Sequence, residues 1–427
     1  MSEPRDTAFE MAASNIRFGP GVTAEVGMDL ADMGARRVLL VVDPVVNELP
    51  PGEVVRDSLR REGVSFDVFD QVRVEPSDKS MQQAIEVARG GNYDAFVALG
   101  GGSTIDTAKV ANLYSTYPAD FMAYVNAPLG EGRPVPGPVK PLIAIPTTAG
   151  TGSETTGVAI FDLSDLHAKT GIAHRHLKPM LGIVDPENTR TMPPMVAASS
   201  GLDVLCHALE SYTARAFDTR SRPARPKLRP AYQGANPISD IWSQQAMVMV
   251  SKWLEIAVRE PGNDEARANM LLASTYAGIG FGNAGVHLCH GMSYPVSGMV
   301  REYCAPGYSG DHPMVPHGIS VVLEAPSVFR FTAPACPERH LRAAEILGVD
   351  VAGRDAKDSG ELLADYLIGL MQRLELPSGL EAIGFTSDDA PALARGTLPQ
   401  HRVTKLSPRE ADERDLVALF QDAMKLW

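Results

Sequence analysis

Residues 201–212 are Gly201-Leu-Asp-Val-Leu-Cys-His-Ala-Leu-Glu-Ser-Tyr212, and this stretch sets the organisation that we predict for the chain. Asp203 and His207 are four residues apart, so on a helix they would project from one face. A carboxylate oxygen and an imidazole nitrogen would then meet, as a divalent metal requires. We therefore predict that helices of the second half of the chain meet over one metal, to which the first half brings a nucleotide.

Downstream histidines offer the remaining metal ligands. His287 and His290 are three residues apart, and spacing alone does not choose between them. His312 and His317 flank two prolines, and either side chain could turn inward. Glu210 could share the helical face of the first two ligands, although a solvated carboxylate is the simpler interpretation. One Asp with two or three His suits Fe(II) or Zn(II).

The other histidines are predicted to be surface or packing residues. Apart from one pair, none of them has a second potential ligand at metal-binding spacing. They are His167, His174, His176, His340 and His401. The four cysteines form no Cys-x-x-Cys motif and are expected to be reduced thiols. Two of them, Cys206 and Cys289, adjoin candidate ligands but are predicted to point away, since adjacent helical residues face in different directions.

Length and composition restrict the class of protein. A chain of 427 residues is too long for one ordinary core, which favours two domains. The 44% hydrophobic and 21% charged residues are typical of a soluble globular protein. A net charge of −13 argues against nucleic acid or an anionic membrane as partner, and no apolar run suits a transmembrane helix. The N-terminus has neither a secretory signal nor an Arg-rich import leader, so we expect a cytoplasmic protein.

The first half of the chain alternates strand-like and helix-like segments, which predicts a parallel α/β sheet. Strands are expected at 37–43, 64–69, 94–99 and 141–145, with an edge strand starting near 14–18. Helices are expected at 22–33, 54–62, 79–89 and 104–113. A Pro-rich segment near 186–194 marks the boundary, and we predict domains at 1–190 and 191–427.

The second half is predicted to be all-α. Helical patterns cover 196–214, 238–259, 264–279, 338–347, 360–374 and 414–427. Residues 219–237 contain four Pro and several Arg and Lys, which predicts a long surface loop between two helices.

A glycine-rich turn, Gly100-Gly-Gly-Ser-Thr-Ile-Asp106, follows a predicted strand and opens a helix. The free N–H groups and dipole of a helix N-terminus favour a pyrophosphate. The turn alone is a weak signal, because it could serve only to pack strand against helix. Asp106, in the first helical turn, could merely complement the helix dipole.

Two further segments strengthen the nucleotide prediction. Asp43 ends a strand, where a carboxylate can accept hydrogen bonds from ribose hydroxyls, although an Asp-Pro turn explains it equally well. The loop Pro146-Thr-Thr-Ala-Gly-Thr-Gly-Ser-Glu-Thr-Thr156 also follows a strand and is dense in hydroxyls, as ligand-lining loops often are.

Taken together, the motifs at residues 100–106, 146–154, 201–210 and 316–319 resemble the iron-containing alcohol dehydrogenases. The resemblance covers the chain from about Phe9. It implies an N-terminal Rossmann-like domain and an all-α C-terminal domain, the dehydroquinate synthase-like architecture, with a metal between them. Matched motif by motif, the implied metal ligands are Asp203, His207, His290 and His317. The implied nucleotide-binding residues are Asp43, Gly100, Gly101, Gly102, Ser103, Asp106, Thr147, Thr148, Ser153 and Lys169.

The chain departs from typical members of that family near the third ligand. Tyr294 stands where they carry a histidine near the nicotinamide, and His287 stands where they have none. These features, with segments 229–239, 282–295 and 396–405, resemble one branch, the hydroxyacid-oxoacid transhydrogenases. The resemblance implies Fe(II), with Zn(II) as the other option, and an NAD that stays bound. It also implies hydride transfer from 4-hydroxybutyrate to 2-oxoglutarate, giving succinate semialdehyde and 2-hydroxyglutarate.

Both substrates are carboxylates, so the pocket should hold a cation. The candidates are Arg301, Lys169 and the Arg and Lys residues of the 219–230 loop. Tyr294 is expected either to relay a proton or to shape the pocket.

Three alternatives stay open from the sequence. The first is an NAD-dependent alcohol or 4-hydroxybutyrate dehydrogenase that releases NADH. The second is a lyase of the dehydroquinate synthase type, whose ligand set is instead Glu with two His. The third is a non-catalytic nucleotide-binding module, which would not need a full ligand set. A homo-oligomer is expected only from the family resemblance.

Overall fold

The computed structural model describes residues 4–166, 168–308 and 312–427, and its chain divides into two compact units. The sheet unit comprises Ala13–Pro193 and Pro261–Gly278. The helical unit comprises the described residues up to Ala12, together with Pro194–Glu260 and the described residues from Ile279 to Trp427. The chain thus leaves the sheet unit between Pro193 and Pro194 and later returns to it for residues 261–278.

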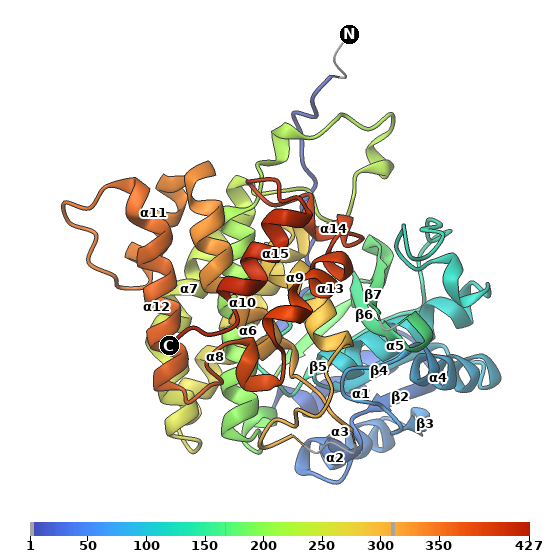
Figure 1. The fold of residues 1–427 in the computed structure, drawn as a ribbon. Coiled ribbons are helices and arrows are strands. Elements are labelled where there is room, and N and C mark those ends of the chain that lie inside the picture. Colours follow the sequence, from blue (N-terminus) through green and yellow to red (C-terminus); the bar gives the residue numbers. More distant parts are fainter. Residues whose placement is uncertain (1–3, 167, 309–311) are drawn as a thin grey trace. The chain divides into compact units, whose positions relative to one another are not determined.

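The sheet unit is built on a parallel sheet of six strands, labelled in part in Figure 1. In sheet order the strands are β1 (Asn15–Phe18), β8 (Leu181–Val184), β5 (Leu142–Pro146), β4 (Ala95–Gly100), β2 (Arg37–Val42) and β3 (Ser65–Phe69). All neighbouring pairs run parallel. The predicted parallel α/β sheet is therefore confirmed.

Helices cover both faces of this sheet because alternate strand residues point to opposite sides. On one side Val38, Leu40 and Val42 share a buried cluster with residues of α1 (Val26–Asp32) and α3 (Pro50–Arg61). On the other side strand residues cluster with α4 (Asp78–Gly90) and α5 (Gly102–Thr116). Burial on both faces explains why these strands are continuous apolar runs in the sequence.

Several elements of the sheet unit were not predicted. They are β8, the short helix α2 (Pro44–Asn47), and an antiparallel pair formed by β6 (Val158–Leu163) and β7 (Ala168–Ala173). The sequence of β7, Ala168-Lys-Thr-Gly-Ile-Ala173, contains a lysine and a glycine, which lower its strand propensity. The pairing with β6 decides its structure instead.

The helical unit confirms the all-α prediction for most of the second half. Its helices are α6 (Pro194–Thr213), α7 (Pro237–Arg259), α9 (Leu288–Gly298), α10 (His317–Thr332), α11 (Pro337–Ile346), α12 (Ser359–Arg373), α13 (Ala390–Thr397), α14 (His401–Thr404) and α15 (Glu413–Asp422). Helix α8 (Asp264–Ala284) begins in the sheet unit and ends in the helical unit. None of the helices in the described residues is long and apolar enough to span a bilayer.

The sequence analysis missed α9, α10, α13 and α14. Of these, α9 and α10 carry an interior proline, Pro295 and Pro326. Proline normally breaks a helix, so the pattern there did not predict one. The last predicted helix was too long: α15 ends at Asp422, and the carbonyls of Ala423 and Met424 instead accept hydrogen bonds from the backbone N–H groups of residues 380 and 381.

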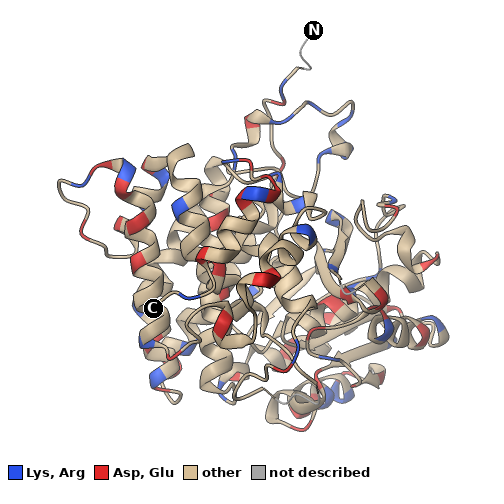
Figure 2. Cartoon of the chain, in the orientation of Figure 1, with Lys and Arg blue, Asp and Glu red and all other residues tan. Residues whose placement is uncertain are grey.

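The loop between α6 and α7 contains the basic stretch predicted at the surface, and its blue segments stand out in Figure 2. It includes two short 3-10 helices, Phe217–Thr219 and Pro226–Leu228. Two of its arginines are fixed: Arg220 and Arg229 both pair with buried Asp6, at 2.8 and 3.0 Å. These guanidinium groups therefore anchor the N-terminal segment to the loop.

Helices α6 and α10 pack so closely that their backbones are in contact at Gly318. A Cβ atom placed on Gly318 would lie 1.9 Å from the carbonyl oxygen of Ser199, so only glycine fits there. This contact brings the first residue of α10, His317, beside the middle of α6.

We predict that Gly318→Ala separates α10 from α6 and destabilises the protein by about 1–3 kcal/mol, the usual cost of overpacking. Unfolding in denaturant measures the change. Gly90→Ala is the control, because a Cβ there meets nothing within 4 Å. Equal stability of the two variants would contradict the role assigned to the α6–α10 contact.

Candidate active site

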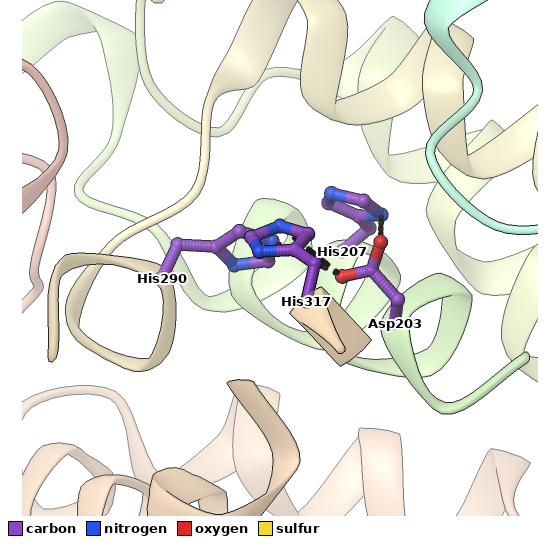
Figure 3. A group of neighbouring side chains, drawn as sticks. All are labelled: Asp203, His207, His290 and His317. Carbon is purple, nitrogen blue, oxygen red and sulfur yellow. Dashed lines mark ion pairs between the residues drawn. The ribbon is translucent and has the colours of Figure 1, made fainter. Parts of the chain in front are cut away.

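Four side chains predicted as metal ligands converge in the helical unit, as Figure 3 shows. Asp203 and His207 project from one face of α6, four residues apart. His290 lies in the first turn of α9, and His317 is the first residue of α10. One potential ligand atom from each of the four lies within 4.8 Å of all the others.

The spacing of these atoms is that of a coordination shell. The carboxylate oxygens of Asp203 lie 3.7 Å from Nδ1 of His207, 3.4 Å from Nε2 of His290 and 3.8 Å from Nε2 of His317. Ligand atoms about 2.1 Å from a tetrahedral metal are separated by roughly 3.4 Å. The four side chains therefore need only small shifts to hold one ion.

Three of these atoms are buried without a hydrogen bond. Oδ1 of Asp203, Nδ1 of His207 and Nε2 of His290 have no hydrogen-bond partner within the described parts of the chain. Leaving buried polar atoms unsatisfied costs about 1–3 kcal/mol each. A bound cation would satisfy all three, so the residues present fit a metal.

The charges of the cluster also suit a metal. Burial lowers the pKa of His207 to about 3, so its imidazole is neutral and keeps a free lone pair. Burial alone would raise the pKa of Asp203, but the surrounding histidines, first His207 and then His317, lower it overall. Asp203 and His207 thus offer an ionised carboxylate and a neutral imidazole, which are the forms that bind metal. Burial opposes protonation of His290, but Glu210 and Asp203 outweigh it and raise its pKa to about 9, so a metal would displace a proton there.

Glu210 is not solvated, so the simpler interpretation of its sequence position was wrong. Its carboxylate is fully buried and accepts hydrogen bonds from the backbone N–H groups of His287, at 3.0 Å, and Cys289, at 2.7 Å. Its other oxygen pairs with Nδ1 of His290. Burial opposes ionisation, but His290 and His287 outweigh it and lower the pKa of Glu210 to about 2.

This carboxylate fixes the orientation of the third ligand. Because Nδ1 of His290 is held by Glu210, Nε2 is left to face Asp203. Histidines that bind metals commonly donate their second nitrogen to such a carboxylate. Glu210 is therefore a positioning residue for His290.

The structure also decides between the two histidines of each pair of candidate metal ligands, His287 and His290, and His312 and His317. His287 lies outside the cluster, where its Nδ1 accepts from the N–H of Leu288 at 2.8 Å and its Nε2 lies 3.0 Å from Oγ1 of Thr213. His312 is not among the four grouped side chains. Burial raises the pKa of the Cys206 and Cys289 thiols, and neither joins the group.

The remaining histidines lie elsewhere. His340 is buried beside Thr332 and Cys336, with its Nε2 3.0 Å from Oγ1 of Thr332. The rings of His174 and His176 are 4.8 Å apart, and His401 is exposed. His167 lies outside the described residues.

The sequence analysis missed two further side chains, one that contacts a ligand of the cluster and one that contacts Tyr294. The ring of Phe281 stacks on His207 with centroids 3.9 Å apart and planes 5° apart. Arg402 donates from Nη2 to the hydroxyl of Tyr294 at 2.6 Å. Arg402 lies in segment 396–405, one of the segments that resemble the transhydrogenase branch, and this resemblance is the available signal for it.

In the sheet unit the predicted nucleotide loops follow neighbouring strands. The chain passes from β3 back across β2 to β4, so the sheet order reverses between β2 and β4, where ligands of open α/β sheets bind. Asp43 follows β2, and Gly101 and Gly102 follow β4. A Cβ on Gly102 would lie 2.5 Å from the side chain of Thr151, so glycine lets the two loops approach.

The first residues of α5 suit a phosphate, because Gly101 provides no side-chain cap for the helix. Asp43 instead caps α2, accepting from the N–H groups of Val45 and Val46 at 2.9 and 3.0 Å. Asp43 thus forms the Asp-Pro turn that was the alternative explanation for it, and its contact with a ribose stays a prediction.

Asp106 and Ser153 connect the second loop to α5. Ser153 donates to Asp106 at 2.6 Å, and Asp106 also accepts from the N–H of Ile160 at 2.9 Å. The buried ammonium of Lys109 donates to Ser153 at 2.5 Å and to the carbonyl of Val158 at 2.8 Å. These side chains hold the loop in place, and direct nucleotide contacts by them stay predictions.

Lys169, on β7, is buried and pairs with Glu75, and its ammonium lies 3.7 Å from Asp162. Its predicted contact with a nicotinamide ribose is untested.

Comparison with known proteins identifies the family. Residues 13–186 match the profile described as iron-containing alcohol dehydrogenase, and residues 231–424 match that of the Fe-containing alcohol dehydrogenase family, C-terminal. The chain belongs to the iron-containing alcohol dehydrogenase family. It is therefore a metal-dependent oxidoreductase.

One relative is the "Hydroxyacid-oxoacid transhydrogenase, mitochondrial" of Rattus norvegicus, 59% identical over 99% of this chain and 91% of the relative. A crystal structure of 1,3-propanediol oxidoreductase has a TM-score of 0.84 and 26% identity, covering 97% of this chain and all of that one. Sulfoacetaldehyde reductase from Bifidobacterium kashiwanohense, in complex with NAD+, has a TM-score of 0.79 and 27% identity, covering 98% and 99%. The expected family and its transhydrogenase branch are confirmed.

The predicted cytoplasmic location is contradicted by the transhydrogenases of Rattus norvegicus, Bos taurus and Homo sapiens, which are named as mitochondrial proteins. The prediction used the lack of a visible leader. The start of a sequence is weak ground for such a prediction, since targeting segments are not part of the folded domains.

We predict that Glu210→Gln weakens metal binding about 10- to 100-fold, as loss of a carboxylate behind a histidine ligand usually does. The amide nitrogen would face Nδ1 of His290 and favour the tautomer whose Nε2 carries the proton. Competition with a chelator measures the affinity. Glu338→Gln, an exposed carboxylate of the helical unit, is the control. Unchanged affinity in Glu210→Gln would contradict the positioning role.

We also predict that His290→Gln loses the metal during purification, whereas His312→Gln retains it, because only the first belongs to the four-residue cluster. Elemental analysis of the two purified proteins distinguishes them. Retention by both, or loss by both, would show that the cluster is not the metal site as assigned.

Proposed function

We propose that this protein is a hydroxyacid-oxoacid transhydrogenase that moves a hydride from 4-hydroxybutyrate to 2-oxoglutarate through a bound NAD. The single observation that carries the proposal is the 59% identity, over 99% of the chain, to the rat transhydrogenase. The cluster of one Asp and three His supports a metal-dependent version of the reaction.

Asp203, His207, His290 and His317 would hold the metal, which we propose to be Fe(II) as the family description indicates. A divalent ion there would act as a Lewis acid that lowers the pKa of a substrate hydroxyl. NAD would accept the hydride and later return it. Zn(II) also suits such ligands, so elemental analysis has to accompany activity.

The chain's own side chains prepare this site. Glu210 holds the ring of His290, and Phe281 lies flat on the ring of His207 and fixes it. Almost all of the cluster is buried, which excludes water from the reacting atoms. Tyr294, one helical turn beyond His290, is held by Arg402.

The sheet unit would bind NAD through the loops after β2, β4 and β5. The proposed contacts are Asp43, Gly100, Gly101, Gly102, Ser103, Asp106, Thr147, Thr148, Ser153 and Lys169. The uncapped N-terminus of α5 and the reversal of strand order between β2 and β4 support this assignment.

The reaction balances in two halves. In the first, C4 of 4-hydroxybutyrate would lose a hydride and its hydroxyl a proton, leaving succinate semialdehyde. In the second, C2 of 2-oxoglutarate would gain that hydride and its oxygen a proton, giving 2-hydroxyglutarate, with NAD as the carrier between the two. No free NADH is consumed or released.

Purified, metal-analysed protein is expected to convert 4-hydroxybutyrate and 2-oxoglutarate to equal amounts of both products with no nucleotide added. Chromatography of the four acids measures the conversion. Turnover that requires added NAD, with NADH accumulating, would contradict the proposal and indicate an ordinary dehydrogenase. Omitting 2-oxoglutarate is the control, because bound NAD then supports only a single turnover.

A further inference from the structure

The substrates of the proposed reaction are anions, and four of the cations predicted to bind them are already paired with carboxylates. Arg301 is exposed and pairs with Asp389. Lys169, in the sheet unit, pairs with Glu75. In the 219–230 loop, Arg220 and Arg229 pair with Asp6.

Arg402 is different, because it faces two phenols. It lies on the short helix α14, and its Nη2 donates to the hydroxyl of Tyr294 at 2.6 Å. Its guanidinium carbon lies 5.0 Å from the ring centre of Tyr232. Its Nη1 is buried and, within the described ranges of the chain, has no hydrogen-bond partner.

A buried guanidinium nitrogen without a hydrogen-bond acceptor indicates a site for a ligand that can accept from it. Guanidinium is charged at any physiological pH, and burying a charge without a counter-ion is costly. The ionisable groups that affect the pKa of Arg402 are the hydroxyls of Tyr294 and Tyr232. No carboxylate is among them in the residues described. An anion is therefore the missing partner.

Two lines of contact connect Arg402 with the metal ligands. On one side Tyr294 follows His290 by four residues on α9, so both project from one face of that helix. On the other side the ring of Tyr232 lies 6.4 Å from that of Phe281, which stacks on His207. Arg402 and the cluster thus share one group of aromatic side chains within the helical unit.

We propose that Arg402 binds the carboxylate that the donor and the acceptor substrates have in common. The proposal rests on the proposed function. In 4-hydroxybutyrate and in 2-oxoglutarate alike, two methylene groups separate the reacting carbon from a carboxylate. One cation at a fixed position can therefore hold both acids with the reacting carbon in the same place. The second carboxylate of 2-oxoglutarate lies beside its reacting carbon and is not the group that Arg402 takes.

Tyr294 acts with Arg402 as a positioning residue. Its oxygen accepts the hydrogen bond from Nη2, so its own O–H remains a donor that can point to the same carboxylate. Typical members of the family carry a histidine at the position of Tyr294. In this chain the residue at that position instead holds the guanidinium of Arg402. This explains why an anionic substrate suits the present chain.

The test compares 4-hydroxybutyrate with its neutral amide, 4-hydroxybutyramide, in wild type and Arg402→Gln holoenzyme. The ratio of kcat/KM for acid over amide is expected to fall about 100- to 1000-fold in the variant, because a buried charged hydrogen bond is lost. KM for 2-oxoglutarate is expected to rise by a similar factor. Lys405→Gln, which removes an exposed charge next to the same helix, should leave both values unchanged.

A purely structural role for Arg402 would lower turnover of acid and amide equally, and that result would overturn the proposal, as would an unchanged ratio. Melting temperature and metal content are recorded for each variant. If Arg402→Gln does not fold, Arg402→Lys replaces it, and inhibition by glutarate is measured. Glutarate carries the carboxylate but cannot react, and its inhibition constant should rise about 10-fold, since lysine loses the paired hydrogen bonds.

The two proposals fail separately. If the wild type does not pass hydride between the two acids without added NAD, the proposed function fails, whatever Arg402 does. If it does, and Arg402→Gln still prefers the acid to the amide as the wild type does, only the assignment of Arg402 fails.

Discussion

The buried carboxylate of Asp203 is the constraint on which the helical unit depends. Three of the cluster's atoms have no hydrogen bond in the described chain, and only a cation satisfies them together. One face of α6 carries Asp203, His207 and Glu210 at helical spacing, so it supplies two ligands and the group that orients a third. The start of α9 must therefore lie against Glu210, and α10 must touch α6 at Gly318.

Much of this arrangement follows from sequence periodicity, and the rest depends on tertiary contacts. Apolar runs revealed the buried strands, and the four-residue spacing paired Asp203 with His207. Spacing alone did not choose between His287 and His290, because the choice is made by Glu210, which accepts from the backbone at 287 and 289 and orients His290. Helices α9 and α10 were hidden by interior prolines. The resemblance to a family, rather than spacing, pointed to the full ligand set.

Charge is used in three ways in this chain. Arg220 and Arg229 join segments by pairing with Asp6, and buried Lys109 fixes a loop of the sheet unit through Ser153 and Val158. Arg402 instead faces aromatic side chains and keeps a buried nitrogen for an anion. A long-range contact of this kind, 108 residues apart in sequence, has no local signature, which is why the sequence analysis did not point to Arg402.

The most direct test of the whole account is to follow the transferred hydrogen itself. Protein with its metal but no added nucleotide is given 4-hydroxybutyrate deuterated at C4, together with 2-oxoglutarate in ordinary water. Mass spectrometry of the 2-hydroxyglutarate then locates the label. The account predicts one deuterium at C2, delivered through the retained NAD. Unlabelled 2-hydroxyglutarate, or label that appears only in nucleotide released to solution, would contradict it.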